Sequence, residues 1–229
     1  MSEPRREILP NSFNNDGLDE RFRRLRYLAN HWNRSATPRT YYWYLTFEPS
    51  PQLQSLVKQC QAAISFPYYD LIPESDLHLT LDRIAFEDDI TPTQLRSIEA
   101  AAIHACAQIT PFDISIGSLG GTPGALGFSA SPSEPIRHLR DALREATLSV
   151  HPKAPIKDAK FHPHLTIAYC NSADIPAARA IAMVERLRTL PSADVAVKES
   201  SLVLLERRQR TYAWQEISRI PLSGQYVEG

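Results

Sequence analysis

The sequence predicts an α+β fold made of two similar lobes, preceded by a further segment at the N-terminus. Two observations support this. Segments with the alternation of β-strands are interleaved with segments that have helical spacing. The same order then recurs, with an interval of 83 residues from Leu45 to Phe128 and 86 residues from His78 to His164. A period this long excludes a solenoid and favours two lobes about a pseudo-twofold axis.

The first half of the chain has the order strand, helix, strand, helix, strand. Its first segment is aromatic and β-branched, and the third alternates apolar and polar residues, as strands do. Pro51 and Pro92 stand where helices begin, because proline is well tolerated in the first helical turn. The predicted strands are 41–47, 76–86 and 112–119, and the predicted helices are 51–64 and 91–109.

The second half repeats that order and adds a strand. Its first helix keeps apolar residues near one face, and its second strand again alternates. The predicted strands are 124–130, 161–170, 194–205 and 212–220, and the predicted helices are 134–150 and 174–190. We therefore expect a two-lobe domain over 40–222, with the change of lobe near 120–124 and a tail at 223–229.

Residues 1–39 form a predicted N-terminal extension that carries eight Lys and Arg against five Asp and Glu. Within it, 18–32 has the spacing of an amphipathic helix. The apolar positions are Leu18, Phe22, Leu25, Leu28 and Trp32. We expect this stripe to pack on its own domain while the arginines are solvated. The alternative is a basic helix that rests on an anionic membrane or on nucleic acid.

Composition limits the classes of function. The chain has 229 residues, 43% of them hydrophobic and 22% charged, which is enough for a folded core. Its formal net charge is -1, whereas a protein that coats long nucleic acid usually has a basic excess. We therefore expect a small ligand and no long nucleic acid. No stretch approaches the ~20 apolar residues of a membrane span.

The cysteines and the N-terminus indicate a compartment. Cys60, Cys106 and Cys170 have no metal-type spacing, so we expect buried free thiols. The N-terminus lacks the apolar region of a secretory signal. Both features favour a cytoplasmic protein.

Two short segments carry the most chemistry, and they occupy equivalent places in the repeat. They are His78-Leu79-Thr80-Leu81 and His164-Leu165-Thr166-Ile167. In a strand, residues two apart point to the same face, so each histidine shares a face with its threonine. If a twofold axis relates the lobes, two imidazoles and two hydroxyls face each other across one groove.

Such a groove suits displacement at phosphorus without an obligatory metal. A neutral histidine can accept a proton from water while a protonated one donates a proton to the leaving oxygen. Threonine hydroxyls can donate to the non-bridging phosphate oxygens. A two-histidine metal site is the competing interpretation, but it needs further ligands, and Pro163 disturbs the geometry of His162.

The paired segments resemble the two H-x-T-x motifs of the 2H phosphoesterase superfamily, and within it the 2′-5′ RNA ligase family, which includes 2′,3′-cyclic phosphodiesterases. The resemblance covers about residues 40–222. It implies a bilobal fold with an antiparallel sheet in each lobe. It also implies catalytic roles for His78 and His164, phosphate contacts from Thr80 and Thr166, and no cofactor or metal.

Further candidate residues flank the motifs. Family members that act on RNA ends often have a basic residue after the second motif, where this chain has Tyr169, while Arg83 follows the first motif at that spacing. Tyr44 and Tyr42 share a strand face and could stack on a base. The cluster at 207–210, with three arginines, is a solvated hairpin tip or, alternatively, a lid or phosphate clamp.

The leading hypothesis is a metal-independent phosphodiesterase, most simply a monomer, that acts on a 2′,3′-cyclic or 2′-5′-linked nucleotide or RNA end. Two alternatives stay open. One is a nucleotide-binding module without turnover. The other is an RNA end-modifying, ligase-type protein that uses the basic N-terminal helix.

Overall fold

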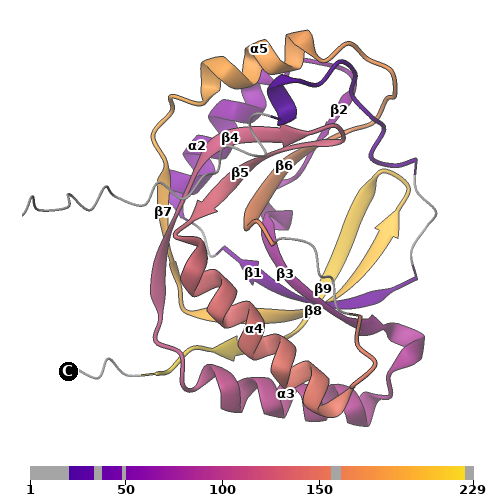
Figure 1. The fold of residues 1–229 in the computed structure, drawn as a ribbon, viewed down its shortest axis with the longest axis vertical. Helices are drawn as coiled ribbons and strands as arrows, with labels where there is room; N and C mark the ends of the chain where they lie inside the picture. Colours follow the sequence, from indigo (N-terminus) through magenta and orange to yellow (C-terminus); the bar gives the residue numbers. More distant parts are fainter. Residues whose placement is uncertain (1–20, 34–37, 48–49, 156–160, 225–229) are drawn as a thin grey trace, which may run out of the picture.

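Two antiparallel sheets form the centre of the protein in a computed structural model that describes residues 21–33, 38–47, 50–155 and 161–224 (Figure 1). The four-stranded sheet has the order β3-β1-β8-β9, and the five-stranded sheet has the order β2-β6-β5-β4-β7. The strands of the first are β1 (Thr40–Thr46), β3 (His78–Phe86), β8 (Glu199–Arg208) and β9 (Thr211–Pro221). Those of the second are β2 (Tyr69–Leu71), β4 (Phe112–Thr122), β5 (Ala125–Ser131), β6 (His164–Cys170) and β7 (Ala193–Val197).

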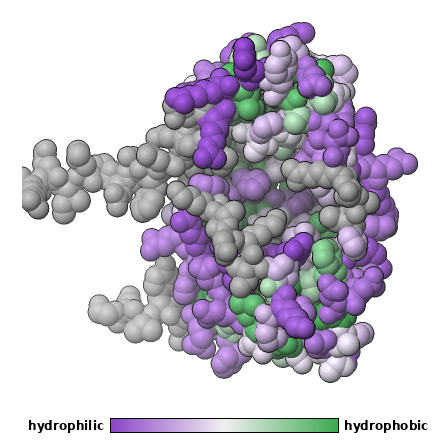
Figure 2. Space-filling view, turned by 45° about the vertical axis from the view of Figure 1, so that its right-hand side comes forward, coloured by the Kyte–Doolittle hydropathy of each residue, from purple (hydrophilic) through white to green (hydrophobic). Residues whose placement is uncertain are grey.

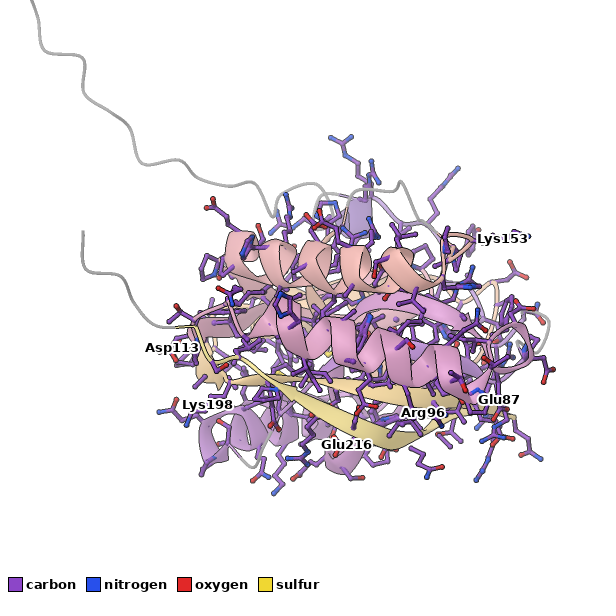
Figure 3. All side chains as sticks on the ribbon, turned by 90° about the horizontal axis from the view of Figure 1, so that it is seen from below. Glu87, Arg96, Asp113, Lys153, Lys198 and Glu216 are labelled. Atoms are coloured by element: carbon purple, nitrogen blue, oxygen red, sulfur yellow. The ribbon has the colours of Figure 1, made fainter. Side chains whose placement is uncertain are left out.

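A pair of helices covers the outer side of each sheet (Figure 1). Helices α2 (Pro51–Ala63) and α5 (Ala178–Leu187) pack on the five-stranded sheet. Helices α3 (Pro92–Cys106) and α4 (Ser133–Val150) pack on the four-stranded sheet and lie side by side, as Figure 3 shows from below. Short 3₁₀ turns at Glu74–Asp76 and Glu87–Asp89 precede and follow β3. The predicted bilobal α+β fold is confirmed.

Local chemistry explains where the helices begin. The Ser50 side chain accepts a hydrogen bond from the backbone N–H of Leu53, and Pro51 follows in the first turn of α2. Thr91 and Gln94 form a capping box at the start of α3. The apolar faces of the helices then meet the inner sheets in one continuous core, which also holds the three buried free cysteines.

The two halves of the chain interleave, so that each lobe contains strands from both halves. Strand β4, from the first half, pairs with β5, and β8, from the second half, pairs with β1. Residues 120–124, where we expect a change of lobe, contain the turn between β4 and β5 in one sheet. The predicted strand 194–205 is likewise two strands, because the chain leaves the five-stranded sheet at Lys198 and enters the other.

The predicted helix over 18–32 is wrong beyond its first turn. Helical backbone is described only for 21–23, and residues 18–20 lie outside the described part, as does the predicted lead-in 1–17. From Leu25 onward the chain is non-helical, with an isolated bridge at Tyr27 and a turn at 31–32. Backbone N–H groups of residues 28, 29 and 31 donate, at 2.8 Å each, to carbonyl oxygens of residues 175, 123 and 170. The apolar stripe is still used, because Phe22, Leu28 and Trp32 are buried.

No helix in the described ranges is both long and apolar enough to cross a bilayer.

Candidate active site

His78 and His164 stand at the first positions of β3 and β6, two strands from different sheets that contact each other. A positive charge on His164 lowers the pKa of His78, so the imidazoles are close enough to interact. The predicted meeting of the two motifs therefore occurs. Figure 2 shows a face of the molecule that is hollowed between its upper and lower parts.

The two motifs have the same pairing with their neighbouring strands. In the four-stranded sheet Thr46 pairs with His78 and Tyr44 with Thr80. In the five-stranded sheet, residues 129 and 127 take the same places opposite His164 and Thr166. The pseudo-twofold relation thus extends to single residue pairs.

A β-bulge follows each threonine and sets what comes next. Leu81 in β3 has no partner in β1, and Ile167 in β6 has none in β5, so the face alternation skips one residue. The burial of the side chains agrees with these bulges. In both strands, the two residues that follow the threonine are buried one after the other. The bulges therefore return Arg83 and Tyr169 to the same side as the histidines and threonines.

Both imidazoles are held by a backbone carbonyl. Nδ1 of His78 lies 2.7 Å from the carbonyl oxygen of Asp76, and Nδ1 of His164 lies 2.8 Å from that of His162. Because a carbonyl oxygen only accepts, Nδ1 must carry the proton in each ring. Nε2 is then the atom that exchanges a proton with a substrate.

The surroundings of the two histidines differ. His78 is half-buried, and its ring stacks on Tyr44 with centroids 4.1 Å apart and an angle of 7° between the planes. Burial lowers the pKa of His78 to about 4, with a further lowering from His164, against the opposing effect of the Asp76 carbonyl. His164 is exposed, so water can hydrate its protonated form. At neutral pH His78 is therefore a neutral imidazole.

Each motif threonine lies beside a tyrosine. The side chain of Thr80 interacts with that of Tyr44, and the side chain of Thr166 with that of Tyr169. Burial raises the pKa of both phenols well above their ordinary value, so both stay protonated at neutral pH.

The predicted substrate-binding tyrosines occupy unlike positions. Tyr44 is only 1% exposed, and one ring face is covered by His78, so its position suits holding the imidazole better than stacking on a base. Tyr42 is half-buried beside Tyr44, with ring centroids 5.8 Å apart. Tyr169 is half-buried with His31 stacked against it at 4.1 Å.

Sequence reasoning found only some of the residues around His78. The cavity beside His78 is lined by Tyr169 and Arg210, which the sequence indicated, and by Asp70, Asp76 and Tyr212, which it did not. Trp214 of β9 lies 6.4 Å from the His78 ring. The sequence indicated the arginines of 207–210, but Trp32 and Asp70, the partners of Arg207 and Arg210, lie far away along the chain and had no local signal.

Within the ranges that the structure describes, no group of three or more His, Cys, Asp or Glu side chains is arranged to hold a metal ion.

Comparison with known proteins gives one matching family and several structures with a similar fold. A family model described as the 2′-5′ RNA ligase superfamily matches residues 47–210. A search of curated proteins finds no match. The structure is similar to TT0787 of Thermus thermophilus, with a TM-score of 0.64 and 19% identity over 82% of this chain and 100% of that one.

It is also similar to LigT of E. coli crystallised with 3′-AMP, with a TM-score of 0.61 and 14% identity over 82% of this chain and 99% of that one. ATU0111 of Agrobacterium tumefaciens gives a TM-score of 0.52 and 15% identity over 79% of this chain and 84% of that one. At these identities the similarity concerns the fold. The family model, however, spans well over half of the sequence and includes both histidine motifs, and the chain therefore belongs to the 2′-5′ RNA ligase superfamily.

Proposed function

We propose that this protein is a phosphodiesterase that hydrolyses a 2′,3′-cyclic or 2′-5′-linked nucleotide phosphate without a metal ion. The observation that carries the proposal is the pair of imidazoles from opposite sheets, each with Nδ1 bonded to a carbonyl and Nε2 available for proton transfer. Two such groups on either side of a phosphate match the needs of in-line displacement.

The unlike surroundings of the two histidines support a division of roles between them. His78, neutral and half-buried, accepts the proton of the attacking water, whose oxygen forms a bond to phosphorus. His164, exposed to water, donates a proton to the ribose oxygen as its bond to phosphorus breaks. Thr80 and Thr166 donate to the non-bridging oxygens, where negative charge grows in the transition state.

A nucleotide-sized ligand agrees with the comparisons. LigT, which has a similar fold, has been crystallised with 3′-AMP and with ATP. We extend only the class of ligand to this chain, because the identity to LigT is 14–15%.

The first experiment measures hydrolysis of 2′,3′-cyclic mononucleotides in EDTA. His78→Asn and His164→Asn should each lower kcat/KM by about 10²–10⁴-fold, the usual contribution of general acid–base catalysis. His138→Asn, at an exposed position on α4, is the matched control and should keep wild-type activity. Full activity in either motif variant would refute the proposal, and binding without turnover by the wild type would favour a nucleotide-binding module.

A second substrate separates acid from base. With a nitrophenyl phosphodiester, the leaving group departs without a proton, so a missing general acid matters little. His164→Asn should recover most of the lost rate on this substrate, whereas His78→Asn should not. The reverse pattern would exchange the two roles.

A further inference from the structure

We propose that the extended N-terminal segment and the tip of the β8–β9 hairpin close one end of the groove, so that the enzyme accepts the terminal phosphodiester of a nucleotide chain and excludes internal linkages. This inference rests on the proposed function and names its substrate class. We call residues 25–33 the strap. The clasp consists of His31 and Trp32 of the strap with Asp70, Arg210 and Tyr212.

The strap is fixed along the five-stranded sheet. Besides its three N–H donors, it accepts hydrogen bonds at the carbonyls of residues 26 and 28, from the N–H groups of residues 177 and 174, at 3.1 Å each. Tyr27 forms an isolated β-bridge with Pro176. This backbone pairing delivers His31 and Trp32 to the end of β6, next to Tyr169.

Aromatic packing joins the strap to the hairpin. The His31 ring stacks on Tyr169, and its Nε2 lies 2.9 Å from the Tyr212 hydroxyl. Trp32 packs against Tyr169 and Tyr212, with centroids 5.1 and 5.2 Å away. Arg207 hydrogen-bonds the Trp32 carbonyl, and its guanidinium lies over the indole. The strap therefore holds together β6 and the hairpin, which belong to different sheets.

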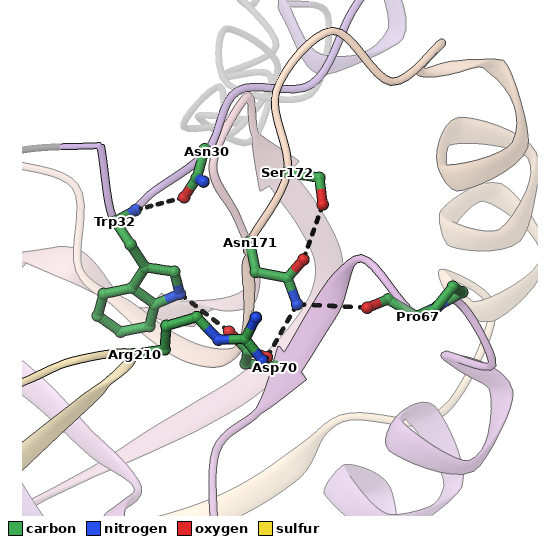
Figure 4. Close-up of polar contacts among 7 residues, drawn as sticks. All are labelled: Asn30, Trp32, Pro67, Asp70, Asn171, Ser172 and Arg210. Carbon is green, nitrogen blue, oxygen red and sulfur yellow. Dashed lines mark hydrogen bonds and ion pairs between the residues drawn. The ribbon is translucent and has the colours of Figure 1, made fainter.

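Asp70 is the polar centre of the clasp (Figure 4). Its carboxylate accepts hydrogen bonds from Nε1 of Trp32 at 3.0 Å, Nδ2 of Asn171 at 2.9 Å and Nη2 of Arg210 at 2.9 Å. These donors come from the strap, the end of β6 and the hairpin tip. One carboxylate thus fixes three separate segments, and its side chain is only 21% exposed.

The clasp borders the site directly. Asp70, Arg210 and Tyr212 line the same cavity as His78 and Tyr169. Asp76 adds a second carboxylate there, while the Arg210 charge is paired with Asp70. A nucleotide chain that continued through this end would meet the aromatic rings of the clasp. Its phosphates would also approach the carboxylates, and these negative charges repel each other.

A cation lies on the histidine side of the first motif. The bulge in β3 places Arg83 on the histidine side, and its cross-strand partner is Tyr42. The buried Nε of Arg83 has no hydrogen-bond partner among the described residues. A cation beside an aromatic ring suits a nucleotide chain, so we expect Arg83 to contact the rest of the substrate while its last phosphodiester lies at the closed end.

The test compares two short oligonucleotides of the same sequence in EDTA. One ends in a 2′,3′-cyclic phosphate, and the other has one 2′-5′ linkage at its middle. For the wild type we expect kcat/KM to be at least about 100-fold higher on the cyclic end. Trp32→Ala should raise the ratio of internal to terminal cleavage by about tenfold, because it removes the indole that contacts Asp70, Tyr169 and Tyr212.

Arg210→Gln, at an exposed position, is a milder variant that should raise the ratio about threefold without loss of folding. Tyr27→Ser is the matched control, because Tyr27 belongs to the strap and is 58% exposed, so the ratio should stay unchanged. Equal cleavage of both substrates by the wild type, or an unchanged ratio in both clasp variants, overturns the inference. If neither substrate is cleaved, the proposed function fails, and the ratio of the two dissociation constants tests the clasp alone.

Discussion

His78 and His164 each donate a hydrogen bond to a backbone carbonyl, but their surroundings differ. This difference makes the two sides of the site unequal. The Tyr44 ring covers one face of His78, whereas His164 faces water. A symmetric motif thus becomes an asymmetric pair through residues outside the motif.

The half-buried imidazole of His78 makes the stability of the fold depend on pH. The pKa of His78 falls from an ordinary 6.5 to about 4 on folding, so between these values the unfolded chain binds the proton more readily. The contribution of His78 to stability is therefore complete above pH 6.5 and is lost as the pH falls toward 4. Each tenfold difference in proton affinity is worth about 1.4 kcal/mol, which allows a loss of about 1–3 kcal/mol.

Denaturant unfolding of the wild type and His78→Gln at several pH values measures this loss. The wild type should lose stability relative to the variant as the pH falls from 6.5 to 4. Parallel curves for the two proteins would show that the folded protein does not disfavour the charged imidazole.

Sequence alone could predict the motif residues but not their neighbours. His78 and Thr80 are two apart in one strand, so their shared face follows from strand geometry. The stacking of Tyr44 on His78 depends on the register between β1 and β3, and a bulge interrupts that register. Asp70 could not be found either, because its partners come from distant segments.

At the scale of elements, strand β5 approaches β6 unusually closely at Gly127. A Cβ atom added there would lie 2.5 Å from the Leu165 carbonyl oxygen and 3.0 Å from the Cα of Thr166. Only glycine therefore allows the ladder that supports the second motif. Gly127 takes the place that Tyr44 occupies opposite the first motif.

Gly127→Ala should lower the free energy of unfolding by about 1–3 kcal/mol, since backbone atoms must move to make room. It should also lower kcat/KM, because the displaced strand carries His164 and Thr166. Gly124→Ala is the matched control, with its nearest contacts at an ordinary 3.5 Å. Thermal denaturation measures the stability of both variants, and a hydrolysis assay measures their kcat/KM. Equal stability of the two variants would contradict the prediction.

The elements that sequence could not predict share one cause. The strap has helical spacing, yet its backbone groups bond to distant segments, and these tertiary contacts override the local preference. The alternation in 194–205 correctly indicated strand, but nothing local marks the transfer between sheets at Lys198. Strand β2 has only three residues, too few for a periodic signal.

For the whole molecule, interleaving makes the two sheets depend on each other. Strand β1 needs β8, and β5 needs β4, so neither half of the chain completes a sheet by itself. The ion pair between Asp82 of β3 and Arg144 of α4, at 2.6 Å, adds a further link between the halves. Unfolding should therefore be one cooperative transition.

Splitting the chain between Pro123 and Gly124, in the turn between β4 and β5, tests this dependence. Each fragment alone should lack a cooperative thermal transition by circular dichroism, whereas the two mixed fragments should recover it. The intact chain, which should unfold in a single calorimetric transition, is the control. A cooperative melting curve from either fragment alone would contradict the prediction.

The exchange of strands between halves also bears on how such a groove can arise. A chain with only the first half would leave β1 without β8, and β4 without β5 and β7. Two copies could complete both sheets by exchanging their β4 strands. One histidine motif from each copy would then meet at the twofold axis of a homodimer. Such a dimer must have identical groove ends. Fusion of the copies into one polypeptide removes that constraint, and in this chain Arg83 follows the first motif where Tyr169 follows the second.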